Sequence, residues 1–215
     1  MKDQFIALNY SNLEDLELRA FLSDILKIFN LPRIRLCTFY SDHIDIHIFK
    51  YTNEYIIGIS TASLFALSKT TIKFAIAHEL GHLFKNKNLI KKRKKLIFYE
   101  KFLTASCFVS LTFTYLFLVN SSYYEKDVWL LLGLSQVLFF LFFVRILHYR
   151  GLHEMEYSAD LFASYILGLN DAERSLQELL NLYEKNNFYS LLSLFSTHPS
   201  FKNRIAHLHN NFEKY

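Results

Sequence analysis

The chain has 215 residues but contains only two cysteines, two prolines and five glycines. Two cysteines, Cys37 and Cys107, are too few for a disulfide framework, and their scarcity agrees with a reducing compartment. The first stretch carries charged residues where a signal peptide would have an apolar core, so we expect no secretory signal. No internal repeat and no linker rich in proline, glycine or serine divides the chain. These absences exclude a disulfide-stapled secreted domain and a chain of linked modules.

Apolar residues are in excess, at 52% of the chain, and 17% of all residues are aromatic. Two stretches, 102–119 and 128–144, contain no charged residue. As helices they would span roughly 27 and 25 Å, close to the thickness of the hydrocarbon core of a bilayer. A pair of buried core helices is the alternative. We expect a transmembrane hairpin, because two such stretches joined by a short polar segment are typical of one.

A cluster of seven cations between Lys85 and Lys95 directly precedes the first uncharged stretch. Such a cluster can bind nucleic acid, form a solvated helix face, or anchor a membrane segment. The hairpin favours the last reading, with a lipid bilayer and no nucleic acid as partner. The positive-inside rule then places these cations, with Arg145 and Arg150, at the cytoplasmic face of the cell membrane. Residues 121–127 would form a short external loop, and both termini would be cytoplasmic.

The remaining residues alternate between helical and strand patterns, which predicts a mainly helical α+β fold with a small β-sheet. The patterns predict helices over 12–30, 64–67, 153–169 and 172–185, and a last helix from about Pro199. A further helix begins at a cap formed by Ser68, Thr70 or Thr71 and runs to about Lys85. Strands are predicted over 34–40, 44–48 and 55–60. We expect the hairpin to interrupt one catalytic domain. The predicted parts are residues 1–101, the hairpin 102–147, and residues 148–215.

One helix carries the sequence His78-Glu79-Leu80-Gly81-His82. Residues i and i+4 of a helix lie on the same face, so both imidazoles can reach one metal ion. Glu79 would lie beside that ion, where it can accept a proton from a metal-bound water molecule. The alternative is a helix that simply carries two histidines. The motif predicts a zinc-dependent hydrolase that still needs a third ligand.

The third ligand does not follow directly after the motif, because Lys85 and Asn88 occupy the positions where a glycine and a histidine would be needed. A distant carboxylate is the next option. Glu156 and Asp160 are spaced i and i+4, so one could bind the metal while the other accepts a hydrogen bond from a ligand histidine. Glu154 is the local competitor, rotated roughly 200° around the same helix.

The ordered set of His78–His82, a membrane hairpin, Glu156–Asp160 and the segment 196–200 with Arg204 resembles the M48 family of integral-membrane zinc metallopeptidases. The resemblance implies a zincin-like (gluzincin) catalytic domain that binds one Zn²⁺ per chain and cleaves protein or peptide substrates at the cytoplasmic membrane face. By position it implies metal ligands at His78, His82 and Glu156, catalytic roles for Glu79 and His198, and supporting roles for Asp160 and Arg204. For His198 the alternative is a turn that caps the last helix, and for Arg204 it is a surface ion pair.

Two other functions remain open from the sequence. The same motif pair is similar to the ImmA/IrrE metalloproteases, which cleave repressors, and a membrane adaptor stapled by a structural zinc ion would also carry these residues. The strand over Tyr55–Ser60 is either an edge strand that could pair with an extended substrate or an ordinary interior strand. The sequence gives neither the substrate nor the oligomeric state.

Overall fold

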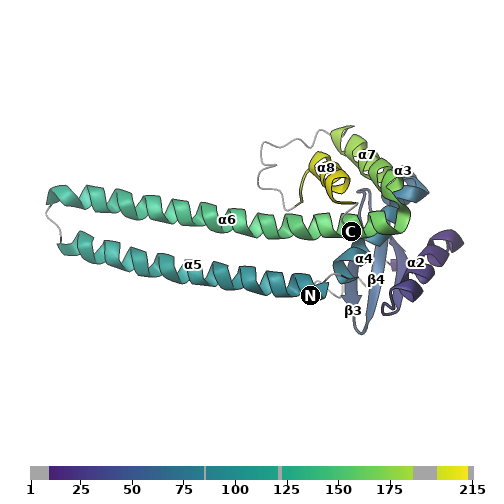
Figure 1. The fold of residues 1–215 in the computed structure, drawn as a ribbon, viewed down its shortest axis with the longest axis horizontal. Coiled ribbons are helices and arrows are strands. Elements are labelled where there is room, and N and C mark those ends of the chain that lie inside the picture. The colour runs from purple at the N-terminus through teal and green to yellow at the C-terminus, as the bar shows by residue number, and fades with distance from the viewer. Residues whose placement is uncertain (1–9, 85, 121–122, 186–197, 213–215) are drawn as a thin grey trace. The chain divides into compact units, whose positions relative to one another are not determined.

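A computed structural model of the chain describes residues 10–84, 86–120, 123–185 and 198–212 (Figure 1). The elements, in chain order, are β1 (Tyr10–Asn12), α2 (Leu16–Ile28), β2 (Ile34–Phe39), β3 (Ile46–Tyr51), β4 (Glu54–Ser60), α3 (Thr61–Ala66), α4 (Lys69–Phe84), α5 (Asn86–Asn120), α6 (Tyr123–Leu167), α7 (Leu169–Lys185) and α8 (Phe201–Asn211). The predicted mainly helical α+β fold with a small sheet is therefore confirmed. The short strand β1 was not predicted.

The chain divides into two compact units. The first contains residues 1–86, 155–194 and 199–215, and the second contains residues 87–154 and 195–198. All strands belong to the first unit, together with α4 and the last turns of α6. The division into residues 1–101, 102–147 and 148–215 stays a prediction.

The sheet has four strands in the order β1-β2-β4-β3. β2 and β4 are parallel, while β1 pairs with β2 and β3 pairs with β4 in antiparallel fashion. β4 contains the segment Tyr55–Ser60 and has a neighbour on both sides, so this segment is an interior strand and the edge-strand reading of it is wrong. The edge strand on that side of the sheet is β3.

The main core fills the space between one face of the sheet and two helices. Registered residues of the three longer strands, such as Leu36, Ile48 and Ile57, share this face. The helix α2 covers it with buried leucine and isoleucine side chains and begins at Asp15, whose carboxylate accepts hydrogen bonds from two main-chain N–H groups of the first turn. Because β-strand side chains alternate in direction, this packing fixes the register of the sheet against α2 and α4.

The helix α4 is buried on two sides, as its largely apolar sequence requires. Ile72, Ile76 and Leu80 join the core against the sheet, whereas Phe74 and Ala77 join a second cluster with residues of α6, α7 and α8. These two buried faces hold α4 between the sheet and the other helices.

The first turn of α4 is held by a carboxylate from α7. Glu178 accepts hydrogen bonds from the main-chain N–H and hydroxyl of Ser68, at 2.8 and 2.6 Å, and from the Thr71 hydroxyl at 2.5 Å. The Ser68 hydroxyl in turn accepts from the Thr71 N–H at 3.2 Å, as a predicted helix cap does. These bonds satisfy donors that the start of a helix leaves unpaired.

Gly81 lets α4 approach the last turns of α6 closely. A Cβ atom at this position would lie 2.9 Å from the Ala159 Cα, 3.1 Å from the Ala159 carbonyl oxygen and 3.2 Å from the Phe162 Cβ. Real Cβ atoms do not come within 3 Å of such atoms, so only glycine permits this separation. The close contact brings the two segments that carry the motif residues together.

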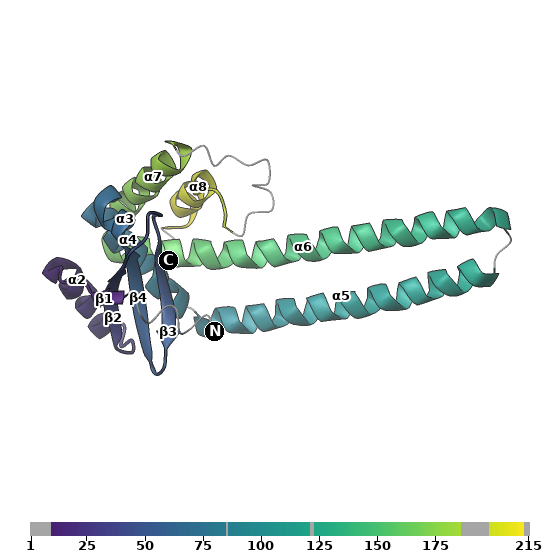
Figure 2. The same cartoon turned by 180° about the vertical axis from the view of Figure 1, so that it is seen from behind.

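The second unit is a helical hairpin. Its helices, α5 and the first part of α6, run side by side in both views (Figures 1 and 2). The Gln136 side-chain oxygen accepts a hydrogen bond from the Ser110 hydroxyl at 2.9 Å, and Gly133 is buried against Thr114. Among the described side chains between Phe98 and Phe143, sixteen large apolar ones are exposed. Nevertheless, among the described residues no helix combines the length and the apolar character that crossing a membrane requires, so the predicted transmembrane hairpin is not confirmed.

Candidate metal centre

Three side chains from α4 and α6 converge on one point. The Nε2 atoms of His78 and His82 are 3.1 Å apart. One oxygen of the Glu156 carboxylate lies 3.4 Å from His78 Nε2, and the other oxygen lies 3.5 Å from His82 Nε2. His78 and Glu156 are buried, while His82 is partly exposed. Helical spacing explains the first pair, and the close contact at Gly81 explains how Glu156 reaches it.

These separations fit the ligand set of a zinc ion. Two ligand atoms about 2.05 Å from zinc and at the tetrahedral angle are separated by about 3.3 Å. The three observed distances lie on both sides of this value. Two imidazole nitrogens and a carboxylate oxygen are also the donor set of many catalytic zinc sites, which leave the fourth position to water. The residues therefore suit Zn²⁺.

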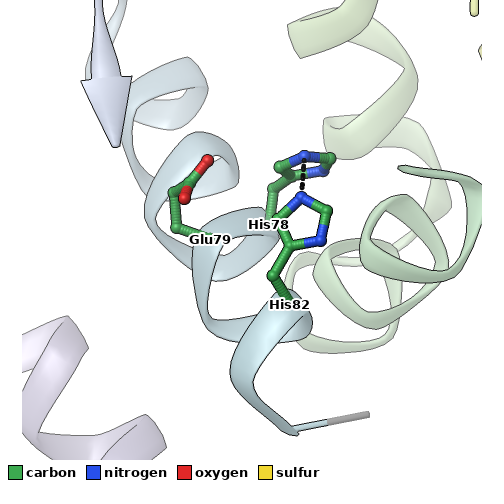
Figure 3. A group of neighbouring side chains, drawn as sticks. All are labelled: His78, Glu79 and His82. Carbon is green, nitrogen blue, oxygen red and sulfur yellow. Dashed lines mark hydrogen bonds between the residues drawn. The ribbon is translucent and has the colours of Figure 1, made fainter. Parts of the chain in front are cut away.

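Glu79 belongs to the same cluster but points elsewhere. Ligand atoms of His78, Glu79 and His82 lie within 4.8 Å of one another, so this trio could also hold a metal. Figure 3 shows the two imidazoles facing each other while Glu79 leaves the helix on a different side. Its carboxylate accepts a hydrogen bond from the Ile48 N–H of β3 at 3.1 Å. Because Glu156 contacts both Nε2 atoms through its two oxygens whereas Glu79 is bonded to β3, the trio with Glu156 suits the ligand role better.

A buried chain of charged groups supports His78 from behind. Its Nδ1 lies 2.8 Å from an Asp160 oxygen, and Arg204 of α8 donates from Nε to the other Asp160 oxygen at 2.7 Å and from its terminal nitrogen to the first. Asp160 is fully buried and Arg204 is nearly so. Because Nδ1 donates to Asp160, it is Nε2 that faces the other ligand atoms.

The electrostatics of these buried side chains favour a cation at His78. Burial lowers the pKa of His78, but the hydrogen bonds that Asp160 and Glu156 accept from it prevail and raise the pKa to about 9. Burial raises the pKa of Asp160, while the charge and hydrogen bonds of Arg204 prevail and lower it. A pocket that stabilises a protonated imidazole attracts positive charge, and a metal ion would take the place of that proton.

Two of the other predicted or competing residues, His198 and Glu154, belong to the second compact unit. His198 is exposed and belongs to the second compact unit, so its predicted role stays a prediction. Residues 196 and 197 of the same motif lie outside the described residues. Glu154 is exposed. Three other histidines of the first unit have partners outside the metal cluster. His47 pairs with Asp45, His209 pairs with Glu173, and His207 stacks on Tyr157.

Sequence reasoning missed the main-chain contribution of β3. The alternation of isoleucine with polar residues over 44–48 signals a strand with one buried face, but a main-chain N–H leaves no signature in the sequence. The contact between Ile48 and Glu79 joins positions 31 residues apart and depends on β3 being the edge strand.

Comparisons with known proteins agree with this geometry. Ste24p from S. mikatae, whose crystal structure is known, is 19% identical and matches with a TM-score of 0.57 over 93% of this chain. The match covers 50% of that protein, so this chain corresponds to about half of its length, and at this identity the likeness shows the fold alone. No curated protein matches significantly.

The family comparison matches peptidase family M48 over residues 13–211. This range includes both histidines of the motif and Glu156, Asp160 and Arg204. The chain belongs to peptidase family M48.

Proposed function

We propose that the chain is a zinc-dependent endopeptidase. His78, His82 and Glu156 would bind one Zn²⁺, and the observation that carries the proposal is the separation of their ligand atoms by 3.1 to 3.5 Å. When bound, the ion supplies Lewis acidity, which polarises the scissile carbonyl and acidifies a water molecule. Asp160 and Arg204 keep His78 in the tautomer that presents Nε2.

Glu79 would move the proton in this reaction. Its carboxylate accepts the proton of the attacking water and passes it to the nitrogen of the leaving amine. The Ile48 N–H fixes the carboxylate at 3.1 Å and leaves its remaining lone pairs for water. A base held by a main-chain group keeps its orientation without a second side chain.

The edge strand β3 would hold the substrate in an extended conformation. Residues 46, 48 and 50 turn their main-chain groups away from β4, because the Ile48 N–H points to Glu79 and the direction alternates along a strand. A peptide that pairs with this edge would lie beside the metal cluster. The substrate is accordingly a protein segment that can become extended.

The substitution Glu79→Gln tests the assignment. We expect purified Glu79→Gln protein to bind zinc as the wild type does but to cleave casein or a peptide at most about a thousandth as fast, because the amide cannot accept a proton. Persistent cleavage would refute the role of Glu79. A zinc-stapled adaptor would show zinc in both proteins and cleavage in neither.

His198 would stabilise the oxyanion that forms on the scissile carbonyl, as the resemblance to the family implies. An imidazole that donates to a developing negative charge contributes about 10²–10³-fold to kcat when it is well placed. The substitution His198→Ala should therefore lower kcat without changing zinc content. His43→Ala, which removes another exposed imidazole, is the matched control.

The helical hairpin would embed in the cytoplasmic membrane, with both chain termini on the cytoplasmic side. Two features support this proposal: the uncharged sequences 102–119 and 128–144, and the exposed apolar side chains of α5 and α6, such as Phe108, Phe113 and Phe139. Exposed apolar surface of this extent is costly in water. The positive-inside rule supplies the orientation.

Extraction and labelling test this topology. We expect the protein to stay with membranes in alkaline carbonate. A cysteine placed at Asn120, in a background without Cys37 and Cys107, should react with an impermeant maleimide added outside the cell. A cysteine at Arg174 should react only after the membrane is opened. Release of the protein by carbonate, or the opposite labelling pattern, would refute the proposal.

A further inference from the structure

The first unit contains a large cavity on the side of the sheet opposite to β3. It has a volume of about 810 Å³ and is lined by residues of α2, β2 and the turn that joins them, and by Asn12 at the end of β1. The sheet order β1-β2-β4-β3 places it at the far edge from the strand that contacts Glu79. The proposed catalytic function makes no use of this cavity.

The lining of this cavity is strongly basic. Arg19 and Lys27 lie two helical turns apart on one face of α2, and Arg33 and Arg35 lie at the start of β2. None of the residues that line the cavity carries a carboxylate. Arg35 pairs with Glu54 at 2.9 Å, whereas the other three cations are exposed and have no ion pair within the described residues.

Main-chain groups open onto the same cavity. β1 pairs only with residues Cys37–Phe39 of β2, and the Leu36 carbonyl accepts a hydrogen bond from the Leu13 N–H. Because main-chain groups alternate in direction along a strand, those of Ile34 point to this side too, beyond the end of β1. The buried side chains of Leu22 and Ile34 provide an apolar floor. A short open strand edge therefore lies beside three unpaired cations and an apolar surface.

We propose that this cavity binds an acidic polypeptide segment in an extended conformation. Carboxylates of the segment pair with Arg19, Lys27 and Arg33, its alternate apolar side chains pack on the floor, and its main chain bonds to Ile34. A free phosphate or a lipid headgroup would use the cations but not the strand edge. Such a site, remote from the metal cluster, would retain protein partners or substrates by a segment that is not cleaved.

Binding is testable without catalysis, in the full chain with Glu79→Gln. The probe is a short fluorescent peptide in which glutamate alternates with valine, and its control alternates lysine with valine. We expect anisotropy to show binding of the acidic peptide alone, with an affinity that falls as salt is added. Reversing all three charges, by Arg19→Glu, Lys27→Glu and Arg33→Glu, should weaken binding by about tenfold or more.

Arg174→Glu, which makes the same charge change on an exposed face of α7, should leave binding unchanged. If the triple variant does not fold, as judged by its melting temperature, Arg33→Gln alone should weaken binding by about threefold. Equal binding of both peptides, or of wild type and the folded variants, would overturn the proposal. Binding of phosphatidylserine vesicles through these cations, without peptide binding, would overturn it in favour of a membrane surface. If neither the peptides nor the vesicles bind, the proposal is overturned, and the cations would serve only to protect the strand edge against aggregation.

Discussion

The contact at Gly81 gives the sharpest prediction of the structure. In Gly81→Ala, the new Cβ would meet the Ala159 Cα at 2.9 Å and the Ala159 carbonyl oxygen at 3.1 Å. Favourable contacts between carbon atoms lie at about 3.5–4.0 Å, so α4 and the last turns of α6 must separate by about 0.5–1 Å. Both of these contacts are with main-chain atoms, which cannot rotate away.

Two effects on stability oppose each other in this variant. Alanine stabilises a helix interior by about 0.5–1 kcal/mol relative to glycine, while overpacking a buried contact costs about 1–3 kcal/mol. We expect a net loss of about 1–2 kcal/mol. The metal cluster is more sensitive still. Glu156 now lies 3.4 and 3.5 Å from the Nε2 atoms of His78 and His82 and would move away from both. A zinc site tolerates deviations of only about 0.2 Å in the distances between metal and ligand.

Zinc affinity should therefore fall by about 10–100-fold, as it does when the surroundings of a metal ligand are disturbed. Zinc content after dialysis against a graded chelator measures this loss, and thermal melting of the metal-free protein measures stability separately. Gly133→Ala is the matched control, because its Cβ would meet only the end of the Thr114 side chain, at 3.3 Å. If Gly81→Ala keeps wild-type zinc affinity, close approach of the two segments does not build the site.

Three further predictions concern the surroundings of the site. Glu178→Gln should lower the free energy of unfolding by about 1–2 kcal/mol at neutral pH. Burial raises the pKa of Glu178, but the bonds from Ser68 and Thr71 prevail and lower it, so the difference from wild type should vanish in urea unfolding as pH falls through this lowered value. Asp160→Asn should cost about 3–5 kcal/mol in chemical denaturation, because it removes the carboxylate charge that pairs directly with the buried Arg204. Ile48→Pro should slow peptide cleavage while zinc content is retained, because it removes the N–H that orients Glu79; an unchanged rate would show that this bond is dispensable.

Local patterns in the sequence predicted which side chains of the candidate site share a helix face. The i and i+4 spacing of His78 with His82, and of Glu156 with Asp160, fixes which side chains share a helix face, and the structure brings both pairs together. The Ser68 cap and the apolar stripes of α4 follow from equally local rules. Periodicity is reliable here because a helix determines its own geometry.

Contacts between distant segments could not be predicted in the same way. The approach of Gly81 to Ala159, the pairing of Arg204 with Asp160 and the position of β3 at the sheet edge join parts of the chain that no spacing relates. Each depends on how the segments pack after the elements have formed. The sequence also left open whether Tyr55–Ser60 was an edge or an interior strand, because an isolated strand pattern does not name its neighbours.

The bond between His78 and Asp160 joins positions that are 82 residues apart, with the whole hairpin between them. The entropy of closing a loop grows slowly with its length, and doubling the loop costs only about 0.6 kcal/mol. The hairpin could therefore lengthen, shorten or be exchanged during evolution with little effect on the pairing of His78 with Asp160. The metal cluster constrains where the insertion begins and ends, and leaves its length free to vary.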